Sequence, residues 1–332
     1  MNIRIYYHKQ ILKILNKNKT IYKQIIKSKE NNWLNVFFVT SPIVAIITRM
    51  IIDYFKIDSK DILIVSFRNT DLSLLNYQYL YIKPGKYDRY FEKLLFISPS
   101  GKKILKKINE INNNFFIYAS LAFREVNWVL NSSKSKGHAY IEEGQHSYMK
   151  IVPYQPSKIT LYNRFKKNWK NRFSENDTIG YYFRDDAIGY IGMLPEVFPE
   201  VKQQKKIVLN NFASLKKYYK PKLMGVRTIG ITCASRRVNK ENLELMIEKL
   251  LSRLPEGSVI KPHPSFTVNK KIFNNFKKIF NQLSRGKVTL CTNKIILEIE
   301  MLYESKKLIG PKSSLSKYAN YLGSSYEYVK LY

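Results

Sequence analysis

The sequence predicts an α/β protein made of two Rossmann-like domains, and two observations favour this class. Short apolar runs typical of buried strands alternate with amphipathic runs typical of helices, and the connections between them are short. Such regular β-α alternation indicates a mostly parallel sheet that helices cover on both faces. The chain has 332 residues, 45% of them apolar, which is enough for two domains of ordinary size.

The first domain is expected over residues 1–222. Its opening run, NVFFVTSP at 35–42, indicates a strand followed by a turn, and Pro42 is well placed to begin a helix over 42–55. The remaining predicted elements are buried strands at 61–67, 93–99 and 138–143 and a helix at 101–112. This half therefore repeats the β-α pattern at least twice.

The second domain is expected over 223–332, after the polar, basic stretch 202–222. Its strands are predicted within 227–235, 257–265, 287–293 and 306–314, and its helices within 239–254, 269–283, 295–305 and 315–323. Two such domains that face each other across a cleft match the glycosyltransferase-B architecture. The active site is then expected between them.

The charge of the chain is unusual, with 57 Lys and Arg against 25 Asp and Glu, a net charge of +32. This charge favours an anionic partner: nucleic acid, an acidic lipid surface or a polyanionic glycan. Two cysteines in apolar runs, Cys233 and Cys291, are typical of a reduced cytosolic protein. The most apolar window, 36–52, is too short and too polar to span a bilayer. We therefore expect a cytoplasmic protein whose membrane contact is peripheral.

Three short polar motifs lie at the predicted carboxyl ends of strands, where open parallel sheets bind ligands. They are Glu142-Glu143-Gly144, His263-Pro264 and Ser313-Ser314. Each motif alone has an ordinary structural interpretation: a solvated strand end, a turn or a helix cap. Their joint placement at three strand ends indicates a common site.

The three motifs supply complementary chemistry. A carboxylate in a cleft can act as general base toward a hydroxyl nucleophile. A histidine can give a proton or positive charge to a departing phosphate, and serines at a helix N-terminus can bind that phosphate. Together these groups describe the transfer of a group from a nucleotide donor to an alcohol.

At these residues the sequence resembles the bacterial sialyltransferases of the lipooligosaccharide sialyltransferase and capsular polysialyltransferase type. Those families carry an acidic-acidic-glycine, a His-Pro and a Ser/Thr-Ser motif in this order, which appear here as IEEGQHSY, KPHPS and GPKSSLSKYA. The resemblance extends more loosely from residue 40 to 323. It implies inverting transfer of sialic acid from CMP-sialic acid to a hydroxyl of a capsular polysaccharide or lipooligosaccharide. A related CMP-activated nonulosonic acid is the alternative donor.

The resemblance also assigns roles. It makes Glu143 the general base, His263 the residue that stabilises or protonates the leaving CMP phosphate, and Ser313 and Ser314 the residues that hold this phosphate. A Pro-x-Glu-x-Leu element of these families binds the donor ribose. Its counterpart here is Glu298-Ile299-Glu300-Met301-Leu302, so Glu300, or Glu298 in its place, is expected to do so. Further expected contacts are Pro264, Lys261, Ser235 and Gly310 on the donor side and Gly144, Ser41 and His146 on the acceptor side.

Neighbouring residues in a strand point to opposite faces, so Glu142 is expected to be structural. No metal cofactor is expected. The chain lacks an Asp-x-Asp motif to hold Mg²⁺ or Mn²⁺, and Glu298 and Glu300 are two residues apart in a predicted helix and do not face the same side. The single phosphate of CMP-sialic acid also needs less charge compensation than a diphosphate.

Two basic amphipathic segments, 9–27 and 158–173, carry much of the positive charge. The second places Leu161, Phe165, Trp169 and Phe173 at four-residue spacing, which makes one aromatic stripe on a helix. Such a stripe either packs into the protein's own core or lies on anionic lipid, and the basic residues could also line a groove for an acidic acceptor chain. The second interpretation predicts a protein at the inner face of the bacterial cytoplasmic membrane.

A basic nucleic-acid-binding protein is the alternative from a different class, with lysines contacting phosphates and aromatic rings stacking on bases. It explains the charge but leaves the three strand-end motifs unexplained. The sequence also has no zinc-ligand spacing, helix-turn-helix pattern or RNA-recognition aromatic motif. Nucleic acid is therefore not the expected partner.

Overall fold

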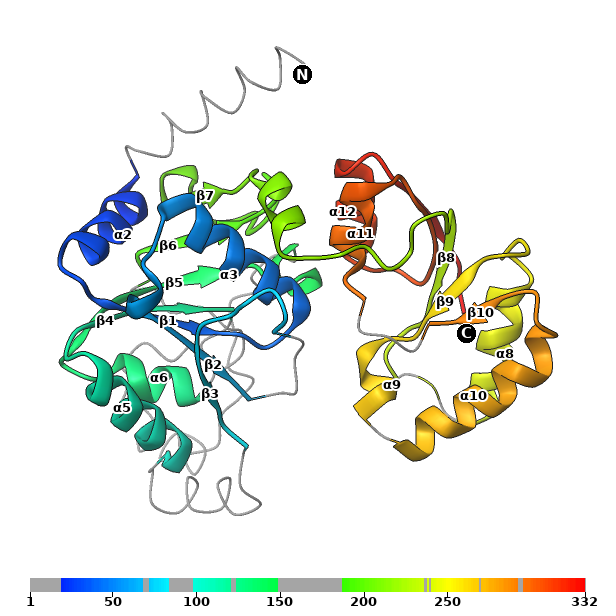
Figure 1. Cartoon of the computed structure of the whole chain (residues 1–332), viewed down its shortest axis with the longest axis horizontal. Helices are drawn as coiled ribbons and strands as arrows, with labels where there is room; N and C mark the ends of the chain where they lie inside the picture. The colour runs from blue at the N-terminus through cyan, green and yellow to red at the C-terminus, as the bar shows by residue number, and fades with distance from the viewer. Residues whose placement is uncertain are drawn as a thin grey trace, which may run out of the picture. The chain divides into compact units, whose positions relative to one another are not determined.

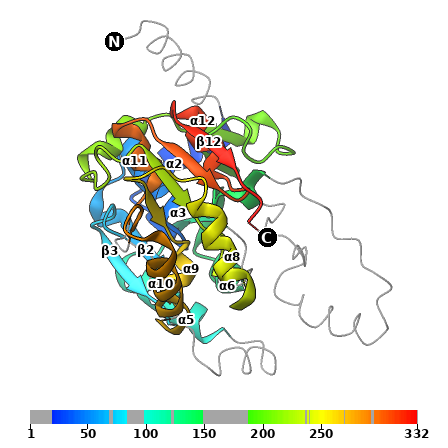
Figure 2. The same cartoon turned by 90° about the vertical axis from the view of Figure 1, so that its right-hand side faces the viewer.

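The computed structural model describes residues 19–67, 72–83, 98–120, 124–148, 187–235, 238, 240–268, 270–291 and 295–331 (Figures 1 and 2). The chain divides into two compact units, Met1–Tyr218 and Tyr219–Tyr332. The sequence places the corresponding boundary between 222 and 223. Both units are layered α/β structures built on a parallel sheet.

Unit 1 contains a seven-stranded sheet in the order β3-β2-β1-β4-β5-β6-β7, and every described strand pair in it is parallel. The strands are β1 (Leu34–Phe38), β2 (Ile62–Ser66), β3 (Gln78–Tyr81), β4 (Phe115–Ala119), β5 (Ser135–Ile141), β6 (Gly189–Gly192) and β7 (Lys206–Val208). The strand order reverses at β1, which pairs with β2 on one side and β4 on the other. The carboxyl ends of β1 and β4 therefore form a topological switch point, where ligands bind in open α/β sheets.

The described helices of unit 1 are α2 (Thr20–Glu30), α3 (Pro42–Phe55), α5 (Pro99–Ile111) and α6 (Arg124–Leu130). Short 3-10 segments lie in the connections between elements: η1 (Ser59–Asp61), η2 (Gln145–Tyr148), η4 (Gln203–Lys205) and η5 (Phe212–Lys217). Helix α3 has the predicted bounds because Pro42 occupies its first turn and Lys56 adopts the left-handed conformation that ends it.

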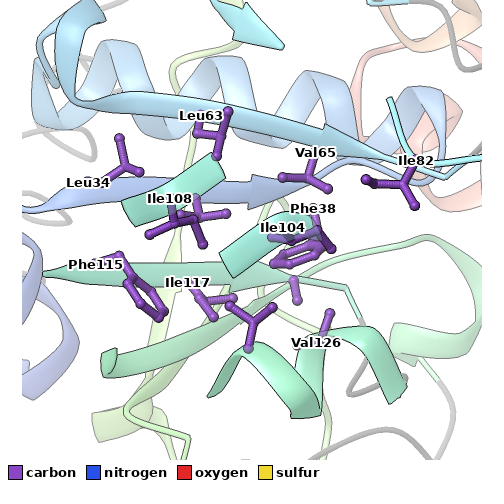
Figure 3. Packing of buried hydrophobic residues seen from close by; sticks show 13 residues of the cluster. Leu34, Phe38, Leu63, Val65, Ile82, Ile104, Ile108, Phe115, Ile117 and Val126 are labelled. Carbon is purple, nitrogen blue, oxygen red and sulfur yellow. The ribbon is translucent and has the colours of Figure 1, made fainter. Parts of the chain in front are cut away.

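The core of unit 1 follows from the alternation of side chains along its central strands. Leu34, Val36 and Phe38 of β1 point to the side covered by α5 and α6, where they meet Ile104 and Ile108 (Figure 3). Phe37 points to the other side, where its ring stacks on Tyr118 with centroids 4.3 Å apart. Because helices cover both faces, these strands are apolar at nearly every position.

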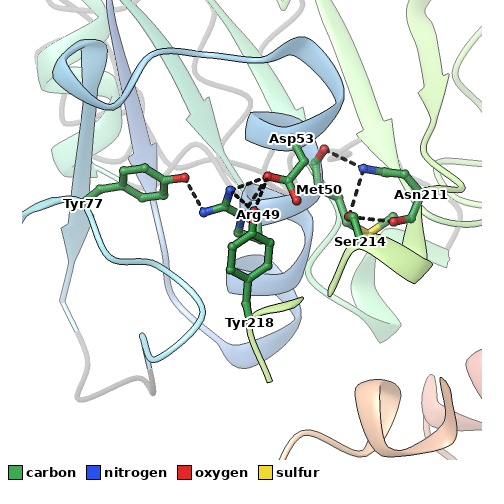
Figure 4. A network of polar contacts seen from close by, with 7 residues as sticks. All are labelled: Arg49, Met50, Asp53, Tyr77, Asn211, Ser214 and Tyr218. Carbon is green, nitrogen blue, oxygen red and sulfur yellow. Dashed lines mark hydrogen bonds and ion pairs between the residues drawn. The ribbon is translucent and has the colours of Figure 1, made fainter. Parts of the chain in front are cut away.

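The last segment of unit 1 is held to α3 by a polar network (Figure 4). The Arg49 guanidinium pairs with Asp53, lies 3.8 Å from the centroid of the Tyr218 ring and donates to the Tyr218 hydroxyl at 2.7 Å. Asn211 Nδ2 donates to the Met50 carbonyl at 3.2 Å. These contacts hold η5 and Tyr218, the last residue of unit 1, against α3.

Unit 2 contains a five-stranded parallel sheet in the order β10-β9-β8-β11-β12. The strands are β8 (Thr228–Ile231), β9 (Val259–Lys261), β10 (Thr289–Leu290), β11 (Lys307–Gly310) and β12 (Ser325–Tyr328). The described helices are α8 (Lys240–Leu251), α9 (Pro264–Val268), α10 (Lys270–Ser284), α11 (Leu297–Tyr303) and α12 (Leu315–Tyr321). Each strand and helix predicted for this half is confirmed, and Cys233 and Cys291 are free thiols.

Several strands were not predicted. The most central is β4, which lies between β1 and β5 and consists of the unbroken apolar run FFIYA. The edge strand β12 and the strands β3, β6 and β7 are further additions. Of the strand expected at 93–99, residues 93–97 lie outside the described residues and Pro99 begins α5.

The two basic amphipathic segments are described only in part. Residues 9–18 and 158–173 lie outside the described residues. In α2, Ile21 and Ile25 are buried, and the Tyr22 ring packs on Phe55 with centroids 5.3 Å apart. The apolar side of 20–27 is thus covered by unit 1 itself, as the core-packing interpretation requires. None of the described helices is both long enough and apolar enough to cross a bilayer.

Candidate functional site

Three polar side chains meet at the carboxyl edge of the unit 1 sheet. Thr40 follows β1, Ser120 follows β4 and Glu143 follows β5. The Thr40 hydroxyl donates to Glu143 Oε1 at 3.4 Å and lies 3.2 Å from the Ser120 hydroxyl. Since β1, β4 and β5 are neighbours in the sheet, the predicted base lies beside the switch point of this unit.

The turn that carries Glu143 is closed by its own hydrogen bonds. The Glu143 N–H donates to Ser147 Oγ at 2.9 Å, and the Ser147 N–H donates to the Gly144 carbonyl at 3.0 Å. Gly144 has φ +107°, a conformation that favours glycine. Gly144 therefore shapes the turn, and His146 lies within its 3-10 segment η2.

Glu142, the neighbour of the predicted base, is fully buried. Its carboxylate accepts a hydrogen bond from the Met193 N–H at 2.8 Å and another from the Tyr148 hydroxyl. A buried carboxylate needs such donors because its desolvation is costly. The structural role predicted for Glu142 is confirmed.

Ser41 occupies the N-cap position of α3, where its carbonyl accepts the Ala45 N–H at 3.1 Å. Its hydroxyl is shielded from solvent and makes no hydrogen bond to any described residue. Ser41 is adjacent in sequence to Thr40, which contacts Glu143. An acceptor-side role for Ser41 remains a prediction.

In unit 2, the exposed His263 follows β9 and is held at two points. Its backbone N–H donates to Thr232 Oγ1 at 2.8 Å, and its ring nitrogen Nδ1 lies 2.9 Å from the Ser265 hydroxyl. Pro264 begins the short helix α9. Ser235, a predicted donor-side residue, bonds Ser265 through its own N–H at 2.8 Å, so the structure links His263 and Ser235 through a residue that was not predicted.

Lys261, two residues before His263 in the chain, interacts electrostatically with Glu298. Lys261 ends β9, and Glu298 lies in the first turn of α11. Burial lowers the pKa of the Lys261 ammonium, and the charge of Glu298 opposes this shift. Burial likewise raises the pKa of the Glu298 carboxyl, against its backbone hydrogen bond and the charge of Lys261. Each group partly compensates the other.

The Glu300 carboxylate is engaged by donors within unit 2. Its side chain is only 1% exposed, and its carboxylate accepts the Tyr219 hydroxyl at 2.6 Å and the N–H groups of Lys222 and Leu223 at 2.8 and 3.1 Å. Through these three hydrogen bonds, the Glu300 carboxylate anchors the first residues of unit 2. A ribose contact from Glu300, or from Glu298 in its place, stays a prediction.

We expect the replacement Glu300→Ala to destabilise unit 2 by about 3 kcal/mol or more, because a hydrogen bond to a charged group is worth about 1.5–3 kcal/mol and three are lost. The urea midpoint of unfolding measures this loss. The exposed Glu256 of the same unit supplies the control Glu256→Ala, which should leave the midpoint unchanged. Equal midpoints for the two variants would contradict the anchoring role.

The Ser313-Ser314 motif follows β11 and precedes α12. Ser313 Oγ accepts the Leu315 N–H at 3.3 Å, and Ser314 occupies the N-cap position without a side-chain cap bond. Before this motif, a Cβ atom added to Gly310 would lie 2.7 Å from the Ile231 carbonyl oxygen. Gly310 thus lets β11 approach β8 closely, and phosphate binding by the two serines stays a prediction.

The polar residues around Glu143 and His263 that sequence reasoning missed are Ser120, Thr232 and Ser265. The signal for Ser265 was present, since it belongs to the KPHPS run. Ser120 had a weaker signal, as the first polar residue after an unpredicted strand.

The comparisons with known proteins bear on the fold. No family model matches the chain, and no curated protein sequence matches it. Among solved structures, the S. aureus MnaA-UDP co-structure has a TM-score of 0.53 at 12% identity, covering 90% of this chain and 79% of that one. The Neisseria meningitidis UDP-GlcNAc 2-epimerase bound to UDP-GlcNAc has a TM-score of 0.48 at 14% identity, covering 90% and 83%. A glycosyltransferase from Rickettsia africae ESF-5 has a TM-score of 0.43 at 12% identity, covering 89% and 78%.

The likeness to MnaA spans both units and agrees with their two parallel sheets. The predicted fold class is thereby confirmed. The chain consists of two Rossmann-like α/β domains of the glycosyltransferase-B type.

Proposed function

We propose that this chain is a glycosyltransferase that moves sialic acid from CMP-sialic acid to a hydroxyl of a bacterial surface glycan. One observation carries the proposal. Each unit presents one acid–base side chain at the carboxyl edge of its parallel sheet, Glu143 in unit 1 and His263 in unit 2, and each is held there by hydrogen bonds. Open α/β sheets bind ligands at the carboxyl ends of their strands, and histidine and glutamate are common general acids and bases.

In the proposed reaction Glu143 takes the proton of the acceptor hydroxyl while the hydroxyl oxygen attacks the anomeric carbon of the sugar. The bond between that carbon and the phosphate oxygen breaks, and CMP leaves with the bonding electron pair. The configuration at the carbon inverts because attack and departure occur on opposite sides. His263 stabilises the charge that develops on the departing phosphate.

The choice of donor rests on the three motifs and on the polar groups near them. Of the three solved structures compared above, MnaA has the highest TM-score. It was solved with UDP, so a nucleotide ligand suits this fold. A donor with one phosphate fits hydroxyl donors such as Ser313 and Ser314 and a single histidine. We propose that the reaction needs no metal, that Glu300 or Glu298 contacts the ribose of the donor, and that Lys261 is a further donor-side contact.

The acceptor is proposed to be anionic, because the net charge of +32 attracts acidic glycans and acidic lipid surfaces alike. The same charge supports a peripheral location at the inner face of the cytoplasmic membrane. A related CMP-activated nonulosonic acid is the alternative donor, since the phosphate-side groups would be the same.

A donor screen tests the proposal most directly. The purified chain is incubated with CMP-sugars and UDP-sugars in parallel, with a sialylated oligosaccharide as acceptor, and release of CMP or UDP is followed. We expect release of CMP from CMP-sialic acid, at the same rate with and without EDTA. Turnover of a UDP-sugar but of no CMP-sugar would overturn the donor assignment, and loss of turnover with EDTA would overturn the metal-independent mechanism.

The nucleic-acid alternative is separated by salt dependence. Binding that is dominated by phosphate contacts weakens steeply as salt rises. CMP should raise the melting temperature of the chain more than AMP does, and this effect should persist at moderate salt. Tight, strongly salt-dependent RNA binding without stabilisation by CMP would instead favour the alternative.

A further inference from the structure

The imidazole of His263 is held by the residue two positions later in the chain. We propose that Ser265 is a positioning residue that keeps neutral His263 in the tautomer with its proton on Nε2. His263 then assists departure of the phosphate by donating a hydrogen bond from Nε2 and does not transfer a proton. The role toward phosphate rests on the proposed function, whereas the tautomer does not.

The tautomer follows from the contacts of Nδ1. The Ser265 N–H donates to Nδ1 of His263 at 3.1 Å. A backbone N–H can only donate, so Nδ1 must accept, and the proton of the neutral ring lies on Nε2. The Ser265 hydroxyl, 2.9 Å from the same nitrogen, gives the ring a second contact on this side.

Ser265 is itself fixed from the neighbouring strand. Ser235, after β8, donates its N–H to Ser265 Oγ at 2.8 Å and its hydroxyl to the Ser265 carbonyl at 3.2 Å. These two bonds connect the loop that follows β8 to the turn that follows β9. The hydroxyl that contacts the imidazole therefore cannot turn away without losing its own partner.

The turn is also anchored in the core of unit 2. The Phe266 N–H donates to the His263 carbonyl at 2.9 Å, and the Phe266 side chain is 1% exposed. Its ring packs on Phe276 of α10 with centroids 5.1 Å apart. Thr232 holds the His263 N–H, so backbone and ring of this histidine are both positioned before any ligand binds.

The consequence concerns the ring edge opposite Ser265. Nε2 lies on that edge, and the side chain is exposed. An N–H already present there can bond a phosphate oxygen as its charge grows, with no change in the protonation of the ring. The phosphate of CMP then departs with its negative charge, and the proton lost by the acceptor stays on Glu143.

Nuclear magnetic resonance tests the tautomer without any assay of activity. The chain has four histidines, so a sample labelled with ¹⁵N in histidine alone gives few signals, and His263→Ala identifies the one of interest. We expect neutral His263 to show a protonated Nε2 and an unprotonated Nδ1 in long-range ¹H–¹⁵N spectra. A protonated Nδ1 in the neutral ring would overturn the inference.

Substitution of Ser265 tests the positioning role. Ser265→Ala should lower kcat by about tenfold, the worth of one hydrogen bond, with little change in the KM of the donor. Ser265→Thr keeps the hydroxyl and should restore kcat. Ser252, whose hydroxyl bonds the Lys249 carbonyl at the exposed end of α8, provides the control Ser252→Ala.

A wild-type kcat in folded Ser265→Ala, or failure of threonine to rescue, would overturn the positioning role. Melting curves of all three variants test whether each is folded. If no CMP-sugar is turned over, the proposed function fails, yet the ¹⁵N spectra still decide the tautomer. The two failures are therefore distinguishable.

Discussion

Replacement of Glu143 by glutamine is expected to lower kcat by about 10²–10⁴-fold, the typical worth of a general base. The amide has nearly the shape of the carboxylate, but it cannot take the proton of the acceptor hydroxyl. The Glu143 N–H would still bond Ser147, so the turn should keep its shape. Affinity for CMP should stay near that of the wild type, since the base meets the acceptor. Steady-state kinetics and calorimetric titration with CMP measure the two quantities.

The adjacent Glu142 is the matched control for this experiment. Glu142→Gln should lower the free energy of unfolding by about 1–3 kcal/mol, because hydrogen bonds to a charged carboxylate are replaced by weaker bonds to a neutral amide. The folded variant should retain most of its turnover. If Glu142 proved essential and Glu143 dispensable, the assignment of the base would be wrong by one residue.

Replacement of His263 by alanine is expected to impair both binding and turnover. A hydrogen bond to a charged group is worth about 1.5–3 kcal/mol, so affinity for CMP should fall by about 10- to 100-fold. Loss of one donor that stabilises developing charge should lower kcat by about 10²–10³-fold. Because the side chain is exposed, melting temperature should change little.

His263→Asn separates this role from simple loss of bulk, since the shorter amide still offers an N–H. We expect its affinity for CMP to lie between those of wild type and His263→Ala. Unchanged CMP affinity and turnover in His263→Ala would remove this residue from the mechanism. The same titrations and rate measurements as for Glu143 give the answer.

The sequence predicted individual helices and strands more completely in unit 2 than in the sheet of unit 1. Pro42 marks the beginning of α3, and in unit 2 turn residues separate apolar runs clearly, so those elements were found. The central strand β4 was missed, although a run such as FFIYA is typical of a strand buried on both faces. Its neighbour β1 is distant in sequence, since β2, β3 and α5 lie between them in the chain, so no local pattern indicates that the two strands pair.

The sequence could propose single residues for the candidate site, such as Glu143 and His263, but it could not give their hydrogen-bond partners. The internal hydrogen bonds of Glu300 depend on where Tyr219 and Leu223 lie, and helix periodicity does not contain that information. The same holds for Thr40, which meets Glu143 from 103 positions away in the chain. Partners of this kind become visible only when the strands are assembled.

The closed turn around Glu143 has a consequence for the entropy of catalysis. Ordering one residue costs about 1–2 kcal/mol of conformational entropy at room temperature. Here the bonds from Glu143 to Ser147, from Tyr148 to Glu142 and from the Phe198 N–H to the Ser147 carbonyl, 2.7 Å long, already restrain the turn. This cost is therefore met when unit 1 folds. An acceptor that binds beside Glu143 loses none of its binding free energy to freezing the backbone of the base.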